Sequence, residues 1–179
     1  FRKIHLGKCL EENNLQAIRD DFNARPVENI SGKDSEYDIL NILSKYGIIN
    51  VAGEKIQVEL WGSGKPMREF LWSEEMADAT VFIMESVNFL DLKNVIEGKE
   101  IRNTHINIGT GTEISIKDVA YLIKKVIGFD GNLWFNTEKP DGTMRKLTDV
   151  SKLNSLGWKH SVSIDEGLTR MYEWYREYN

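Results

Sequence analysis

"EKIQVELWGSGKPMREFLW", residues 54–72, joins a strand-like pattern to a glycine-rich turn. Apolar side chains alternate with polar ones in its first half, at Ile56, Val58 and Leu60. This period of two predicts a half-buried strand that leads into the turn, and REFLW after the turn predicts a second, short strand. Trp61 and Arg68 therefore stand on either side of a flexible connection between two strands.

Helical patterns with start and stop signals lie on both sides of this stretch. Residues 2–24 predict one or two helices, and residues 35–47 predict a helix that begins at Ser35 and ends at Gly47. The other predicted elements are helices over residues 73–87, 115–128, 149–156 and 163–179, with Ser73, Ser115 and Ser163 as caps, and strands over residues 104–111 and 132–135. Strands that alternate with helices indicate a helix-rich α/β class with short, partly parallel strands.

The composition is that of an ordinary globular chain. Its 179 residues are 41% hydrophobic and 28% charged, with a formal net charge of -5 and both signs interspersed. This balance argues against a nucleic-acid partner and favours a cytoplasmic protein. Because Cys9 is the single cysteine and the three histidines lie far apart, neither a disulfide framework nor a zinc site is expected. No apolar run approaches the roughly 18 residues of a membrane span.

The amino-terminal segment enters a helical pattern without a capping residue. Phe1 is not preceded by Met, and Ile4, Leu6 and Leu10 follow it at helical spacing. We expect the chain to be a piece of a longer protein.

Three short motifs suggest chemistry that their surroundings do not support. GSGK resembles the end of a phosphate-binding P-loop, but Glu59 and Pro66 stand where that motif needs a glycine and a hydroxyl residue. GTGTE lacks the third glycine of a dinucleotide fingerprint and fits a strand-to-helix turn better. Tyr121 and Lys125 have the Tyr-x-x-x-Lys spacing of short-chain dehydrogenases, yet an amphipathic helix produces that spacing by chance, and a structural role is favoured.

What remains is a set of binding residues rather than a catalytic set. The guanidinium of Arg68 suits a diphosphate, Lys3 and Lys65 add positive charge, and Trp61 can stack on a planar or sugar ring. Asp141, on the tight turn of KPDGT, can accept hydrogen bonds from a ligand. Two structural interpretations carry equal weight at this point: a salt bridge from Arg68 to Glu69 or Glu74, and burial of Trp61 in the core.

Several long segments resemble one family. They are VELWGSGKPMREFLWSEEMADATVFIME, HINIGTGTEISIKDVAYLIKKVIGFDGNLWF, KPDGTMRKLTDVSKLNSLGW and SIDEGLTRMYEWY. Together they are similar to the carboxyl-terminal half of the GDP-L-fucose synthases, which are extended short-chain dehydrogenases with a Rossmann-type fold. The resemblance runs from Phe1 to the last helix, except for residues of about 11–54, which look like a helical insertion present in some members.

The resemblance implies an NADP-dependent conversion of GDP-4-keto-6-deoxy-D-mannose to GDP-L-fucose by epimerisation and hydride reduction. It also implies that the full-length enzyme is a homodimer, and that the NADP-binding domain and every catalytic residue precede Phe1. On that basis this chain is the substrate-binding region, with no catalytic, cofactor-binding or metal-binding residue of its own, and is inactive alone. Cys9 and His5 are therefore interpreted as structural residues and not as the catalytic Cys and His of the family.

Four residues match the substrate contacts of the family. Arg68 and Lys3 are expected to pair with the diphosphate, Trp61 to pack on a ring, and Asp141 to make a polar contact with the nucleotide sugar. The segment WSEE departs from the family pattern, and its acidic residues are interpreted as helix capping. Two alternatives stay open: another nucleotide-sugar epimerase or reductase of the superfamily, and a non-catalytic module that binds a nucleotide sugar.

Overall fold

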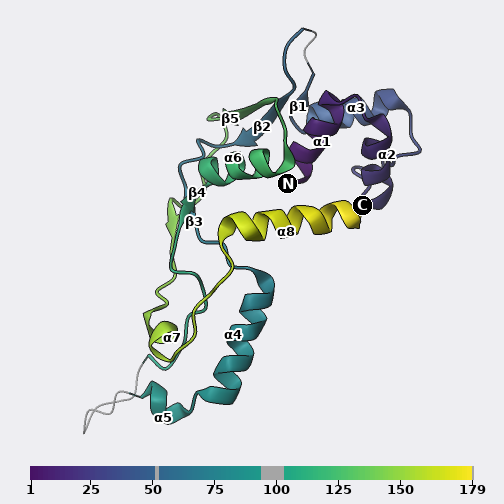
Figure 1. Cartoon of the computed structure of the whole chain (residues 1–179). Coiled ribbons are helices and arrows are strands. Elements are labelled where there is room, and N and C mark those ends of the chain that lie inside the picture. Colours follow the sequence, from purple (N-terminus) through teal and green to yellow (C-terminus); the bar gives the residue numbers. More distant parts are fainter. Residues whose placement is uncertain (51–52, 94–102, 179) are drawn as a thin grey trace. The chain divides into compact units, whose positions relative to one another are not determined.

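The computed structural model describes residues 1–50, 53–93 and 103–178, and it divides into two compact units (Figure 1). The first unit consists of Phe1–Pro66, Ser115–Met144 and Leu168–Asn179, and the second unit consists of Met67–Ile114 and Arg145–Gly167. Each unit has its own hydrophobic cluster, so each is described by itself.

The first unit is built on a small mixed sheet of order β1-β2-β5. Strand β1 (Ile48–Ile49) pairs antiparallel with β2 (Gln57–Trp61), and β2 pairs parallel with β5 (Asn132–Asn136). The strand predicted from the apolar alternation is confirmed as β2. Val58 in it is fully buried, while Trp61 at the strand end is exposed. The expected α/β class with partly parallel strands is therefore confirmed.

Helices surround this sheet, and their bounds follow the sequence signals. They are α1 (Arg2–Glu11), α2 (Leu15–Ala24), α3 (Glu36–Lys45), α6 (Ile116–Ile127) and most of α8 (Ile164–Glu177). The hydroxyls of Ser35 and Ser115 accept hydrogen bonds from the third helical N–H of α3 and α6, as predicted. Gly128 ends α6 at a φ of 73°, a left-handed conformation that glycine adopts without strain.

Helix α1 packs closely on β2. A Cβ atom at Gly7 would lie 2.7 Å from a methyl carbon of Val58, so a larger residue would force the helix away from the sheet. Helix α2 joins the same core through Asp21, which is almost fully buried and accepts hydrogen bonds from Arg2 Nε at 2.7 Å and from the hydroxyl of Tyr175 at 2.5 Å. Residues 11–50 thus form helices and a short strand, and their status as an insertion remains a prediction.

The second unit holds the other elements, around a smaller core. They are β3 (Met67–Arg68), α4 (Ser73–Ser86), α5 (Phe89–Leu92), β6 (Arg145–Lys146), α7 (Ser151–Ser155) and the first residue of β4 (Ile114–Ser115). The sheet order is β4-β3-β6, with β3 parallel to β6. The core consists of Ala79, Leu153 and Trp158, and the indole N–H of Trp158 donates to Asp78 at 2.7 Å.

Of the strands predicted in this unit, one is absent and another is displaced along the chain. Residues 104–111 form no strand. Ile106 and Ile108 still pack against the small core, so the alternation of apolar residues indicates burial here but not strand pairing. The strand predicted at REFLW is shifted to Met67–Arg68. A physical reason is the carboxylate of Glu69, which accepts the backbone N–H groups of Thr110 and Gly111 and so replaces ladder hydrogen bonds at this point.

The predicted cap of α4 is also wrong. Ser73 is the first helical residue, Trp72 occupies the cap position, and the helix start has no side-chain cap. Glu74 and Glu75 do lie in the first turn, where the helix dipole favours anions. Glu75 does more than this, because one of its oxygens accepts the backbone N–H groups of Ser161 and Val162 and so ties α4 to the segment before α8.

Two carboxylates, the half-buried Glu69 and the buried Glu75, make the second unit sensitive to acid. Burial acts to raise the pKa of Glu69, but hydrogen bonds from Thr148, Gly111 and Thr110 outweigh it and place the pKa below the usual 4.5. The same balance, with hydrogen bonds from Ser161 and Val162, lowers the pKa of Glu75. A carboxyl group with a lowered folded-state pKa stabilises the fold fully above its unfolded pKa, and this contribution is lost as the pH falls through the folded value.

We therefore expect the melting temperature of the protein to decline as the pH falls below about 4.5. Circular dichroism melts between pH 6 and pH 3 measure this decline. Glu69→Gln should make the decline shallower, because the variant no longer carries the titrating group. Glu85→Gln, at an exposed position of α4, should keep the wild-type profile. Identical profiles for Glu69→Gln and the wild type would contradict the assignment.

Candidate functional site

The candidate site lies at the carboxyl ends of the parallel strands β2 and β5. Trp61 and Asn136 are the last residues of these strands and stand opposite each other in the ladder. In open α/β sheets, ligands bind beyond the carboxyl ends of parallel strands. Three of the four predicted binding residues, Lys3, Trp61 and Asp141, have their described contacts at this end of the first unit.

Asp141 fastens its loop to the glycine turn. Its carboxylate accepts the backbone N–H of Ser63 at 2.8 Å and the hydroxyl of Ser63 at 2.6 Å. Hydrogen bonds from the side chain and backbone of Ser63 lower the pKa of Asp141, so the group is an anion at neutral pH. Each carboxylate oxygen can accept a further hydrogen bond, which leaves room for a contact with a ligand hydroxyl or amide.

Gly62 makes this fastening possible. Its φ is 83°, and a Cβ atom at this position would collide with a carboxylate oxygen of Asp141. The backbone N–H of Gly62 donates to the carbonyl of Asn136 at 2.9 Å, which extends the pairing of β2 and β5 by one hydrogen bond. The first glycine of the turn is therefore required both for the backbone conformation and for the approach of Asp141.

Trp61 is a surface residue. Its side chain is 69% exposed, so its interpretation as a core aromatic is wrong. The ammonium of Lys139 lies 5.4 Å from the centre of the indole ring, within the range of a cation–π interaction. An exposed indole beside a cation, at the ends of two parallel strands, can stack on a planar or sugar ring of a ligand.

Lys3 is held by the protein. Its ammonium donates to the backbone carbonyl of Glu59 at 2.5 Å, which connects α1 to β2. Burial lowers the pKa of Lys3, and the negative charge of Glu59 opposes this effect. The carboxylate of Glu59 accepts the side-chain amide of Asn136 at 2.6 Å, so these residues form one network across the strand ends. An ammonium has three donors, so Lys3 can still meet an anion.

Arg68 belongs to the second unit, on β3, and its guanidinium donates to the carbonyl of Met67 at 2.6 Å. The carboxylate of Glu69 accepts hydrogen bonds from Thr110, Gly111 and Thr148, and the carboxylate of Glu74 accepts one from the indole of Trp72. The two acidic residues considered as partners of Arg68 thus have other described partners.

Cys9 and His5 form a contact that resembles a nucleophile and its base. Cys9 Sγ lies 3.4 Å from Nε2 of His5, and Nδ1 of His5 lies 3.1 Å from the hydroxyl of Tyr172. Burial, however, raises the pKa of Cys9 to about 11, so the thiol stays protonated at neutral pH and is a poor nucleophile. This favours the structural interpretation of both residues. Among the described residues, no group of three potential ligands could hold a metal ion.

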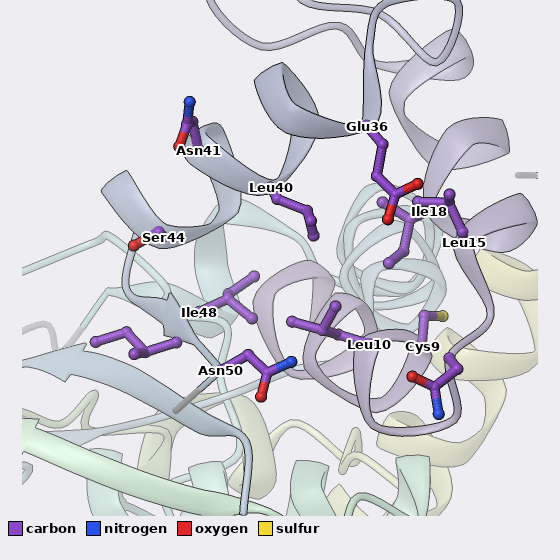
Figure 2. Close-up of a pocket in the computed structure, with 12 residues that line it drawn as sticks. Cys9, Leu10, Leu15, Ile18, Glu36, Leu40, Asn41, Ser44, Ile48 and Asn50 are labelled. Carbon is purple, nitrogen blue, oxygen red and sulfur yellow. The ribbon is translucent and has the colours of Figure 1, made fainter. Parts of the chain in front are cut away.

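A cavity lies away from the strand ends, between α1, α2, α3 and β1. It encloses about 590 Å³, and Figure 2 shows Leu10, Ile18, Leu40 and Ile48 pointing into it, with Asn41 and Ser44 at its edge. This volume is within the range of small-molecule pockets. Glu36 is its one charged lining residue among those described, so it offers no cation for a phosphate. The candidate site for an anionic ligand therefore stays at the strand ends, where Lys3 and Lys139 lie.

Sequence reasoning missed four residues at the strand ends: Glu59, Ser63, Asn136 and Lys139. Ser63 and Lys139 lie in segments that the sequence did single out, GSGK and KPDGT, but a single side chain there gives no sign of its partner. Glu59 and Asn136 appear as ordinary polar positions of two strands, and their contact follows only from the register of β2 with β5.

Comparison with known proteins places the chain in a family. The model of the NAD dependent epimerase/dehydratase family matches residues 13–109, which is more than half of the chain. The chain belongs to the NAD dependent epimerase/dehydratase family. The described residues contain no helix that is long and apolar enough to cross a membrane.

The similar proteins include enzymes named for GDP-sugars. A putative GDP-L-fucose synthase 2 of Arabidopsis thaliana is 46% identical over 121 residues, which cover 68% of this chain and 33% of that protein. A GDP-6-OMe-4-keto-L-xylo-heptose reductase from C. jejuni has a TM-score of 0.83 and 40% identity, over 99% of this chain and 46% of that one. A GDP-L-fucose synthetase from Naegleria fowleri bound to NADP has a TM-score of 0.55 and 25% identity, over 68% of this chain and 35% of that one. The chain thus spans between a third and a half of these proteins.

A test of the turn uses two glycines with the same backbone conformation. Gly62 and Gly53 both have a φ of 83°, but nothing lies within 4 Å of a Cβ atom at Gly53. Alanine at either position costs about 1–2 kcal/mol of left-handed strain. Gly62→Ala should lower the free energy of unfolding in urea by more than Gly53→Ala, because it also displaces Asp141 from Ser63. Equal losses in the two variants would mean that Asp141 does not hold the turn.

Proposed function

We propose that this chain is the sugar-nucleotide-binding portion of an NADP-dependent enzyme that epimerises and reduces a GDP-linked 4-keto sugar. The reaction assigned to it is the conversion of GDP-4-keto-6-deoxy-D-mannose to GDP-L-fucose. The observation that carries the proposal is the exposed indole of Trp61 on a turn that Asp141 fastens at the ends of two parallel strands, in a chain 46% identical to a putative GDP-L-fucose synthase over 121 residues.

Each binding residue has a role in this proposal. Trp61 packs on a ring of the GDP-sugar, and Asp141 accepts a hydrogen bond from a hydroxyl or amide while it keeps its contacts with Ser63. Lys3, on α1 and hydrogen-bonded to the carbonyl of Glu59 in β2, contacts the diphosphate. Arg68, which belongs to the second unit, is proposed as a diphosphate contact on the strength of the family resemblance, and a guanidinium donates two parallel hydrogen bonds to phosphate oxygens. These residues bind and orient the substrate, which lowers the entropic part of the barrier.

The proton transfers and the hydride transfer are assigned to the rest of the full-length protein. NADPH would supply the hydride there, and the NADP-bound structure from Naegleria fowleri supports this cofactor. A homodimer is proposed for the full-length protein on the strength of the family resemblance. The non-catalytic module remains the alternative outside the enzymes, and the assay below separates the two.

A second candidate substrate is a GDP-linked 4-keto heptose. The reductase from C. jejuni aligns with 99% of this chain, including the helices of residues 11–50, whereas the GDP-L-fucose synthetase from Naegleria fowleri aligns with 68%. The specific observation for this candidate is the TM-score of 0.83, with 40% identity over nearly the whole chain. A GDP-L-fucose synthase of Sinorhizobium fredii also aligns with 88% of this chain, so the extent of alignment does not itself decide the substrate. The two candidates share the GDP group and the 4-keto group and differ in the sugar.

Turnover by the full-length protein that carries this chain tests the function. We expect NADPH to be oxidised with GDP-4-keto-6-deoxy-D-mannose and the product to be GDP-L-fucose. Faster turnover of GDP-6-OMe-4-keto-L-xylo-heptose would select the second candidate. NADPH oxidation with a dTDP- or UDP-linked keto sugar alone would contradict both candidates, and no NADPH oxidation with any of these sugars would favour a non-catalytic module.

The role of Arg68 is tested in the same protein. Arg68→Ala should raise the KM of the GDP-sugar by about 10- to 150-fold, since charge-assisted hydrogen bonds contribute roughly 1.5–3 kcal/mol. Arg68→Lys should give an intermediate KM, because lysine keeps the charge without the two parallel donors. The matched control is Arg145→Ala, which removes an arginine of the same unit that already pairs with Glu113. An unchanged KM in Arg68→Ala would assign Arg68 to a structural contact.

A further inference from the structure

Lys139 is placed on the indole ring of Trp61 by its own loop. The backbone N–H of Lys139 donates to the carbonyl of Asn136 at 3.2 Å, and the N–H of Glu138 donates to the side chain of Asn136 at 3.0 Å, which makes a tight turn directly after β5. Two residues later, Asp141 fastens the loop to Ser63. The main chain of Lys139 is therefore held on both sides, while its side chain is exposed.

The ammonium of Lys139 rests on an uncharged partner. It lies 5.4 Å from the centre of the Trp61 ring, and indole is the aromatic side chain that attracts a cation most strongly. Among the residues that the structure describes, no carboxylate forms an ion pair with Lys139. A cation–π contact does not neutralise the ammonium as a carboxylate would, so the positive charge remains available to an anion.

The position of this charge suits one part of a nucleotide sugar. Trp61 and Lys139 follow the carboxyl ends of β2 and β5, where the proposed function places the ligand. A GDP-sugar brings both a planar base or sugar ring and a diphosphate to such a site. An indole with one face near an ammonium can receive a ring on its open face while the ammonium meets a phosphate oxygen beside it.

We propose that Lys139 is a further substrate-binding residue that contacts the diphosphate of the nucleotide sugar, and that the ring of Trp61 holds its ammonium in position before the ligand binds. The inference rests on the proposed function and adds to it a residue and an arrangement. Holding the side chain in place reduces the rotamer entropy that a free lysine would lose on binding.

The test measures the binding of GDP-mannose, a stable GDP-sugar, to the full-length protein by titration calorimetry at low and high salt. Lys139→Gln should weaken binding about 10-fold at low salt, as expected for the loss of one charge-assisted hydrogen bond. The difference from the wild type should shrink at about 1 M salt, because salt screens an exposed charge. Lys139→Arg should restore most of the affinity.

The matched control is Lys33→Gln, which makes the same change of charge on an exposed loop away from the strand ends. Equal affinities of Lys139→Gln and Lys33→Gln would overturn the inference. A loss of affinity in Lys139→Gln that is the same at every salt concentration would also overturn it, since that result indicates a loosened loop rather than a lost phosphate contact.

The proposed function can fail separately. If the wild type binds UDP-glucose and not GDP-mannose, the assignment to GDP-sugars is wrong, and the same comparison of variants with UDP-glucose decides the role of Lys139. If the wild type binds neither nucleotide sugar, both the proposed function and the role of Lys139 are overturned.

Discussion

The parallel pairing of β2 with β5 is the constraint on which the candidate site depends. It sets Trp61 opposite Asn136, so that the two loops that follow the strands begin side by side. From the first loop come Gly62 and Ser63, and from the second come Lys139 and Asp141. A shift of one residue in this register would turn Val58 out of the core and move every one of these contacts. The positions of the site residues therefore depend on the register of β2 with β5.

Much of the first unit could be predicted from its sequence because its signals are local. Ser35 and Ser115 cap helices, Gly128 ends one, and the alternation through Val58 marks a strand, since each of these effects acts within a few residues. The second unit was predicted less well for the opposite reason. Its boundaries depend on Glu69 and Glu75, whose carboxylates bind backbone groups far along the chain, and no local pattern reveals such partners.

The same distinction applies to the binding residues. Trp61, Arg68 and Asp141 could be selected because Trp and Arg beside glycines, and Asp on a tight turn, are unusual placements that suggest binding. Their partners could not be selected. That Asp141 binds Ser63, that Lys3 binds the carbonyl of Glu59, and that Lys139 lies on Trp61 all depend on how separate segments meet. Residue type indicates a capacity for binding, whereas the fold determines which groups share a site.

The hydrogen bonds between Ser63 and Asp141 also bear on how the protein acquires its site. They join residues 78 positions apart, and the intervening chain includes α4, α6 and β5. Contacts between distant residues form late, because the entropy of closing the long loop must be overcome before the contact stabilises anything. A nascent chain that has been synthesised only as far as α6 contains Trp61 and its glycine turn but cannot yet close the site. Binding competence therefore requires that synthesis has passed Asp141 and that the strand pair β2–β5 has formed.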